Sequence, residues 1–195
     1  MGAVGKVVSI NISSKRGEKK VPIKEVVIDK YGIEGDGHSG KWHRQVSLLS
    51  YERIQEVNKK GINAGPGDFA ENLTTQGIDL KKLKIGDIII IGGKDNIANL
   101  SKAFKSNKII KNSANKKMIT QLKEDNSKFK EAGFKNFKNL ESYKDEVVLE
   151  VTQIGKKYTE AIRAYYIPGL PKEGIFCRVL KPGKIKTEDN ILAVK

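Results

Sequence analysis

Short apolar runs separated by turns recur along this chain and limit what it can fold into. They cover residues 4–12, 21–28, 45–50, 88–91, 147–154, 175–180 and 190–194. Alternating or β-branched runs of this length are typical of β-strands. One good helix is predicted, over residues 51–60, with Ile54 and Val57 on one face and Gly61 as its stop. Many short strands and few helices predict a mainly β protein with a barrel-like domain.

The segment from about residue 95 to residue 146 interrupts this pattern. Its apolar residues recur at helical spacing, as Ile97, Leu100 and Phe104 do. We therefore expect a single domain over residues 1–195 with a Lys-rich helical insertion at about 95–146. The insertion could cover the barrel or bind a partner, and a loosely docked surface insertion is the plainer alternative.

The chain is strongly basic, with 37 Lys and Arg against 23 Asp and Glu and a formal net charge of +14. Much of the excess lies in the expected insertion, which has many Lys but no Arg. A basic protein can bind nucleic acid, although Lys without Arg and with few aromatic residues is a weak form of that signal. A solvated basic surface is the simpler explanation of the charge, so binding of nucleic acid or an acidic partner is a secondary prediction.

Three absences bear on the compartment. The sequence has no apolar run of 18 residues and no signal peptide at its start, so we expect no membrane association. Cys177 is the single cysteine, which excludes an intrachain disulfide and fits a reducing environment. These features predict a cytoplasmic protein.

Residues 32–50, which read GIEGDGHSGKWHRQVSLLS, concentrate the chemistry of the chain. Glycines at this density let the backbone adopt positive φ and approach a ligand closely. The polar side chains among them include two His and an Arg, residues that bind anions and move protons. Because a strand is expected directly afterwards, the cluster should be held rigidly. The stretch therefore predicts a functional site.

Four segments in the order of the chain carry a family resemblance. They read GDGHSGKWHRQVSLLSYE, PGDFAENLTTQGIDLKKLKIGD, VVLEVTQIGK and PKEGIFCRVLKPGKIK. Together they closely resemble the MOSC domain, the molybdenum cofactor sulfurase C-terminal domain, in its short stand-alone bacterial form. The resemblance covers roughly residues 2–93 and 147–195. It implies a compact, mostly antiparallel β-barrel, in agreement with the strand pattern.

The resemblance also implies a function. Members of the family are thought to bind molybdenum cofactor or to carry sulfur to it, so the expected partners are molybdenum cofactor biosynthesis proteins or molybdoenzymes. The family is further associated with binding of molybdenum ions and of pyridoxal phosphate. Its catalytic members use a cysteine that accepts a persulfide.

This chain departs from the family at that cysteine. The resemblance places the cysteine at Tyr158 and a neighbouring histidine at Thr159. Cys177 lies in the EGIFCRVL run, where the family usually has a small apolar residue, so we expect a buried strand residue and not a relocated nucleophile. Persulfide transfer requires a thiolate, which Tyr and Thr cannot supply. The catalytic residue is therefore unknown, and the sequence retains the family pocket without the family nucleophile.

A cofactor with a pterin and a phosphate needs cations, backbone N–H groups and hydrogen bonds to a heterocycle. Arg44 offers a planar fork for phosphate or an oxyanion, and Lys156 and Lys172 can add point charges. Asn72 and Thr74 can serve a pterin edge. The predicted ligand-binding residues are Asp36, His38, His43, Arg44, Gln45, Asn72, Thr74, Lys156, Lys172 and Glu173.

Several of these residues have structural alternatives. Asp36 could orient His38 or His43, or it could cap the glycine-rich turn through its own backbone. Trp42 could pack in the fold or stack on a ligand, and Glu173 could be a structural hydrogen-bonder in its turn. No protein-bound zinc or other metal site is expected, because a third good ligand is missing.

Three functions follow from these observations. The first is binding of molybdenum cofactor or a related anion without a protein thiol. The second is persulfide sulfur transfer to the cofactor by Cys177 or an unrecognised route. The third is a basic adaptor that binds nucleic acid or an acidic partner through the insertion.

Overall fold

The computed structural model describes residues 3–106, 146–155 and 174–194. Its strands are β1 (Ala3–Ile12), β2 (Val21–Ile23), β3 (Glu25–Asp29), β4 (Gly32–Ile33), β5 (Val46–Ser50), β6 (Leu73–Gln76), β7 (Ile88–Gly92), β8 (Val147–Ile154), β9 (Ile175–Lys181), β10 (Gly183–Lys186) and β11 (Asn190–Val194). The helices are α1 (Tyr51–Asn58), the short 3₁₀ helix η1 (Leu80–Lys82) and α2 (Lys94–Ser106). Neither α-helix is long and apolar enough to cross a membrane, among the residues described.

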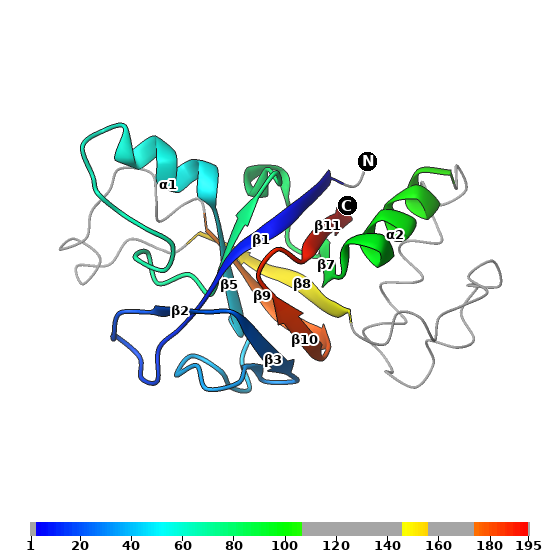
Figure 1. Ribbon diagram of the computed structural model, residues 1–195. Helices are drawn as coiled ribbons and strands as arrows, with labels where there is room; N and C mark the ends of the chain where they lie inside the picture. The colour runs from blue at the N-terminus through cyan, green and yellow to red at the C-terminus, as the bar shows by residue number, and fades with distance from the viewer. Residues whose placement is uncertain (1–2, 107–145, 156–173, 195) are drawn as a thin grey trace.

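Seven of the strands close into a barrel (Figure 1). The hydrogen-bonded ring runs β11–β7–β8–β9–β5–β6–β1 and returns from β1 to β11. Every neighbouring pair in the ring is antiparallel except β5 and β6, which are parallel. Parallel neighbours need a crossover connection, and α1 lies in the connection between these two strands. The predicted mainly β, barrel-type fold is confirmed.

The remaining strands flank the barrel. β2 pairs with β1 outside the ring, while β3, β4 and β10 form a separate three-stranded sheet. The single strand expected over residues 21–28 is thus two strands that join different sheets, interrupted at Lys24. Residues 32–45, which lead from β4 into β5, therefore start from the small sheet and end in the barrel.

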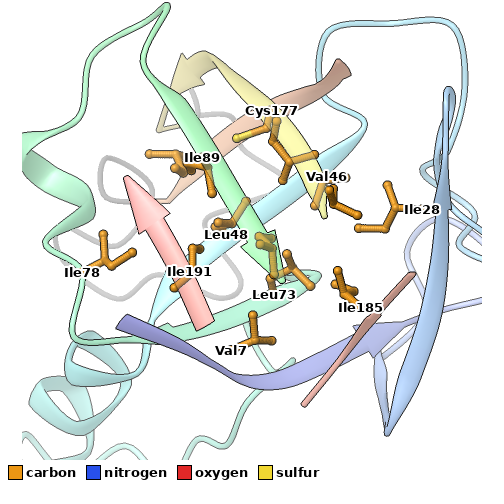
Figure 2. Close-up of a cluster of buried hydrophobic side chains, with 14 of the residues drawn as sticks. Val7, Ile28, Val46, Leu48, Leu73, Ile78, Ile89, Cys177, Ile185 and Ile191 are labelled. Carbon is orange, nitrogen blue, oxygen red and sulfur yellow. The ribbon is translucent and has the colours of Figure 1, made fainter. Parts of the chain in front are cut away.

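The barrel interior is filled by aliphatic side chains from different strands. Figure 2 shows Val7, Leu48, Leu73, Ile89 and Ile191 converging inside the ring, and each is at most 1% exposed. Their burial is the main source of the stability of the fold. The ring is a packed core, and the polar chemistry of the chain lies in its connections.

β7 is apolar on both faces because it has two sets of neighbours. Ile89 and Ile91 belong to the interior cluster, whereas Ile88 and Ile90 pack outside with Ile97 of α2. Side chains alternate across a strand, so a run of four isoleucines serves both faces. The helical spacing at residue 97 therefore predicted α2 correctly, and this helix covers the outer face of β7.

The first turn of α2 is hydrogen-bonded to the start of β8. Asn96 of α2 donates to the Glu146 carboxylate (Nδ2 to Oε1, 2.8 Å) just before β8 begins. Gly92 leaves room for this contact, since a Cβ there would lie 2.8 Å from Glu146 Cγ. The rest of the expected insertion, residues 107–145, lies outside the described residues, and the single-domain organisation remains an expectation.

Candidate functional site

The glycine-rich stretch packs against the connection between β1 and β2. Gly37 donates its N–H to the Ser13 carbonyl at 2.7 Å. A Cβ at Gly37 would lie 2.8 Å from Lys15 Cα and 2.9 Å from the Ser14 carbonyl oxygen, so only glycine permits this approach. Two segments that are distant in sequence, residues 13–20 and 34–45, are therefore in direct contact.

A buried ion pair stabilises this contact. The side chains of Asp36 and Lys20 are each 1% exposed, and Lys20 Nζ donates to Asp36 Oδ2. The same oxygen accepts the Ser13 N–H at 3.1 Å, while Oδ1 accepts the His38 N–H at 2.9 Å. Burial acts to raise the pKa of Asp36, but the hydrogen bonds from Lys20, His38 and Ser13 outweigh it and the pKa is lowered. Asp36 is therefore an ionised carboxylate.

Asp36 also orients the His38 imidazole. His38 Nδ1 lies 3.2 Å from Asp36 Oδ1, and an ionised carboxylate can only accept, so Nδ1 carries the hydrogen and Nε2 is the free acceptor. Burial, together with the positive charges of Lys20 and Arg16, lowers the pKa of His38 despite the opposing effect of Asp36. His38 is thus neutral near pH 7, with its side chain 30% exposed.

His43 takes its orientation from β8 instead. Its Nε2 lies 3.1 Å from Gln153 Oε1, and Gln153 Nε2 donates to the Gly155 carbonyl at 2.6 Å. Because the amide nitrogen is committed to Gly155, Oε1 is the acceptor and His43 carries its hydrogen on Nε2. Thr152 also donates its hydroxyl to the His43 carbonyl. Of the two orientations considered for Asp36, the structure has only the one toward His38.

Two guanidinium groups lie against the Trp42 ring. The Cζ atoms of Arg16 and Arg44 are each 4.9 Å from its centroid, and Arg44 Cζ is 5.7 Å from the Phe176 ring. Trp42 Nε1 donates to the His38 carbonyl at 2.8 Å, which holds the indole in place. Cation–π contacts of this kind stabilise and orient the cation. The half-buried Trp42 therefore packs against both arginines and positions them.

Arg44 carries an unsatisfied donor. Its Nε is shielded from water and has no hydrogen-bond partner in the structure as described. Arg16 by contrast uses Nε to donate to the Gly37 carbonyl at 3.2 Å. A buried, unpaired donor on a charged group is unfavourable unless a ligand accepts from it. We call His38, Trp42, His43, Arg44 and Arg16 the loop site.

Three of the predicted ligand-binding residues point into the fold. Gln45 Nε2 donates to the carbonyls of Lys30 (2.9 Å) and Gly40 (3.0 Å), and its Oε1 accepts the Val179 N–H at 2.7 Å. This residue links the glycine-rich loop to β9. Both polar atoms of the Gln45 amide are therefore bonded within the protein, and the residue is only 6% exposed.

Asn72 and Thr74 belong to β6 and its approach. Asn72 Oδ1 accepts from the Ser47 N–H and hydroxyl (3.1 and 2.9 Å), and Thr74 donates to Glu71 Oε1 at 2.7 Å. Asn11 connects the two, because its carbonyl accepts from Asn72 and its Nδ2 donates to Thr74. Both residues are at most 2% exposed. The structure does not bring them to the loop site.

The loop site adjoins the base of the segment 156–173. Gly155 at the end of β8 donates its N–H to the Gly174 carbonyl at 2.6 Å, just before β9. His43 contacts β8 through Gln153, and Arg44 contacts β9 through Phe176. Lys156, Tyr158, Lys172 and Glu173, named by the sequence, lie outside the described residues.

Cys177 is in the barrel core. It is 0% exposed and pairs with Val46 and Val151 on the neighbouring strands. Burial, with a smaller contribution from the Glu150 carboxylate, raises the pKa of the Cys177 thiol far above its ordinary value. The group is therefore a protonated, packed side chain.

The native protein is accordingly expected to resist labelling by a thiol reagent. In Ellman's assay, Cys177 should react at least 100-fold more slowly in the folded protein than in guanidinium chloride, because only thiolate exposed to solvent is nucleophilic. Rapid stoichiometric labelling without denaturant would contradict this assignment. Cys177→Ala, with no thiol, gives the blank.

The fold and the site define the class of protein: a closed seven-stranded barrel whose glycine-rich connection carries two histidines and an arginine. The family model of the MOSC domain matches residues 35–129, which include the loop from Gly35 onward. The resemblance to the MOSC domain predicted from the sequence motifs is confirmed. It connects this chain, at the level of the family, with molybdenum cofactor chemistry.

Solved structures share the fold. The YuaD protein from Bacillus subtilis aligns with a TM-score of 0.61 at 19% identity, covering 100% of this chain and 98% of that one. YiiM from Geobacillus stearothermophilus aligns with a TM-score of 0.55 at 17% identity, covering 98% of this chain and 75% of that one. YiiM from Escherichia coli aligns with a TM-score of 0.51 at 15% identity, covering 100% of this chain and 70% of that one. No curated protein matched the sequence. At these identities the likeness shows the fold alone.

No group of three or more His, Cys, Asp or Glu side chains able to hold a metal ion occurs in residues 3–106, 146–155 and 174–194.

Of the site residues predicted from the sequence, the structure brings together Asp36, His38, His43 and Arg44. Arg16 joins them from a polar turn that gave no local signal in the sequence. Only the tertiary contact with Trp42 reveals it.

Proposed function

We propose that this protein binds an anionic ligand, molybdenum cofactor or a related oxyanion, at the loop site. The observation that carries the proposal is the Arg44 guanidinium, whose Nε is shielded from water without a partner in the described structure while a second guanidinium, Arg16, lies against the same indole. Guanidinium groups match phosphate and carboxylate oxygens in a planar, two-pronged geometry.

The electrostatics of the site favour an anion. Asp36, the carboxylate that contacts His38, is already paired with Lys20 and is buried with it. Arg16 and Arg44 therefore keep their charges for another acceptor. Desolvation by Trp42 and Phe176 strengthens any charge-assisted hydrogen bond that Arg44 forms.

The residues present fit the anionic part of the cofactor. Arg44 and Arg16 would hold its phosphate or an oxyanion, and the free nitrogens of His38 and His43 would meet its polar edge. When bound, the cofactor supplies a dithiolene that carries molybdenum. The protein itself supplies binding and orientation.

We further propose that sulfur, where it is transferred, is the outer sulfur of a persulfide on a cysteine of a partner, whose S–S bond breaks and leaves the partner's thiolate. The single cysteine of the chain is Cys177, which is buried in β9. A molybdenum cofactor biosynthesis protein or a molybdoenzyme is the expected partner. The loop site would then hold the acceptor while the partner delivers the sulfur.

Titration calorimetry with molybdate and with isolated molybdenum cofactor tests the binding. Arg44→Gln is expected to weaken binding about 10- to 100-fold, because a hydrogen bond to a charged group contributes about 1.5–3 kcal/mol. Arg44→Lys should recover part of the affinity, since it restores the charge without the planar fork.

Lys60→Gln is the matched control, because it removes one positive charge from an exposed position just beyond α1. Its affinity should equal that of the wild type. Absence of saturable binding by either ligand, or equal affinity in Arg44→Gln and the wild type, would overturn the proposal.

A further inference from the structure

We propose that His38 takes up a proton when a dianion binds at the loop site, so that ligand binding and the charge of this imidazole are coupled. The inference rests on the proposed anion binding and extends it by naming the group that changes its charge and the direction of the change. Nothing in the binding function by itself requires such a coupling.

The hydrogen-bond geometry leaves one position for the proton. Nδ1 of His38 already donates to the Asp36 carboxylate, so the incoming proton goes from solvent to Nε2. The product is an imidazolium whose Nδ1–H still faces the Asp36 carboxylate. No other covalent bond forms or breaks, and the net change is one proton and one positive charge gained by the site.

The charges around the ring oppose this step in the free protein. Lys20 and Arg16, both from the connection between β1 and β2, act on His38, and Asp36 is the carboxylate that contacts it among the described residues. Arg44 adds a further cation, on the Trp42 ring that is bonded to the His38 carbonyl. Burial of the ring, together with the charges of Lys20 and Arg16, outweighs Asp36 and keeps the imidazole neutral when no ligand is present.

A bound dianion reverses that balance. It neutralises the arginines, so the cost of a further positive charge on His38 falls and the pKa of His38 rises on binding. Linkage is reciprocal, so the anion must in turn bind more tightly as the pH falls between the free and bound pKa values. If binding takes up one proton, the affinity for the anion can rise at most about tenfold for each pH unit by which the pH falls.

His43 provides the internal comparison. It lies on the same loop, with its ring centroid 6.3 Å from that of Trp42, but its partner is the neutral amide of Gln153. A neutral amide gives no counter-charge to an imidazolium, whereas Asp36 does so for His38. The two histidines therefore differ in the one feature that the proposal requires.

Calorimetry with molybdate, a dianion near neutral pH, tests the coupling in the full chain. The binding enthalpy is measured at one pH in two buffers of different ionisation enthalpy, and the difference gives the protons taken up. We expect uptake of up to one proton for the wild type and for His43→Gln, and none for His38→Gln. An NMR titration of the His38 Cε1–H in the wild type should show its pKa rising when molybdate is added.

The outcomes separate the two proposals. Saturable binding without proton uptake, or uptake that persists in His38→Gln, overturns the coupling and leaves anion binding intact. Failure of the wild type to bind molybdate or the cofactor overturns both. If His38→Gln does not fold, an unchanged His38 titration in the molybdate-bound wild type overturns the coupling by itself.

Discussion

Lys20→Met is expected to lower the free energy of unfolding by about 3–5 kcal/mol, the usual cost of removing one partner from a buried ion pair. Lys20 and Asp36 are each 1% exposed at the side chain, and no water can replace the lost ammonium without opening the contact. Methionine has a similar length and apolar stem, so the loss reports the charge and not a cavity. Urea denaturation followed by circular dichroism measures it.

Lys19→Met is the matched control. Lys19 precedes Lys20, its side chain is 78% exposed, and it pairs with Asp68 at the surface. Exposed pairs contribute about 0–1 kcal/mol, so this variant should stay close to the wild type. Equal stability of the two variants would contradict the assigned role of Lys20.

Lys20→Met should also change how the free energy of unfolding depends on pH. In the wild type the pKa of Asp36 is lowered, so this group contributes stability that is present above the ordinary Asp range and is lost as the pH falls through the folded-state pKa. Without Lys20, only the backbone hydrogen bonds from His38 and Ser13 still oppose the effect of burial, so the pKa of Asp36 rises from its wild-type value. The difference in stability between Lys20→Met and wild type should therefore shrink in acid.

Gln45→Leu is expected to destabilise the protein by roughly 3–5 kcal/mol. It leaves the Val179 N–H and the Lys30 carbonyl without this partner, whereas the Gly40 carbonyl keeps the Trp42 N–H. Each unsatisfied buried group costs about 1–3 kcal/mol. Leucine nearly matches glutamine in size, so packing is largely retained. Thermal and urea unfolding give the measurement.

Gln55→Leu makes the same chemical change at an exposed position of α1 and should alter stability by less than about 0.5 kcal/mol. If Gln45→Leu were equally mild, Gln45 would not be the link between the loop and β9. If Gln45→Leu instead lost anion binding while keeping wild-type stability, Gln45 would be a ligand-binding residue.

Much of the barrel could be predicted because its strands are apolar on at least one face. β8 and β11 were expected at the residues they occupy, and β7 was expected to end one residue earlier than it does. β6 was missed because its sequence is LTTQ, and the burial of the polar residues Thr74 and Thr75 is not something that hydropathy registers. Short β10 alternates Lys and Ile over only four residues, too few for a clear period.

The candidate site likewise contains residues that the sequence could predict and residues that only the folded chain reveals. His38, His43 and Arg44 could be predicted together because they are close in sequence and chemically distinctive. Residue type alone could not tell that Gln45 would turn inward, since a polar side chain before a strand can face either a ligand or the backbone. Arg16 is separated from Trp42 by the whole of β2, β3 and β4, and only the folded chain brings the two together.

The pairing of β1 with β11 has a consequence for biosynthesis. Ala3 lies opposite Ala193 and Lys6 opposite Asn190, so the seam of the ring joins strands from opposite ends of the described chain. A ribosome delivers β1 long before β11, and until then one edge of β1 and one edge of β7 lack their partners. Such contacts of long sequence separation slow folding and leave strand edges open to other chains. We therefore expect the nascent protein to depend on protection of these two edges until β11 emerges.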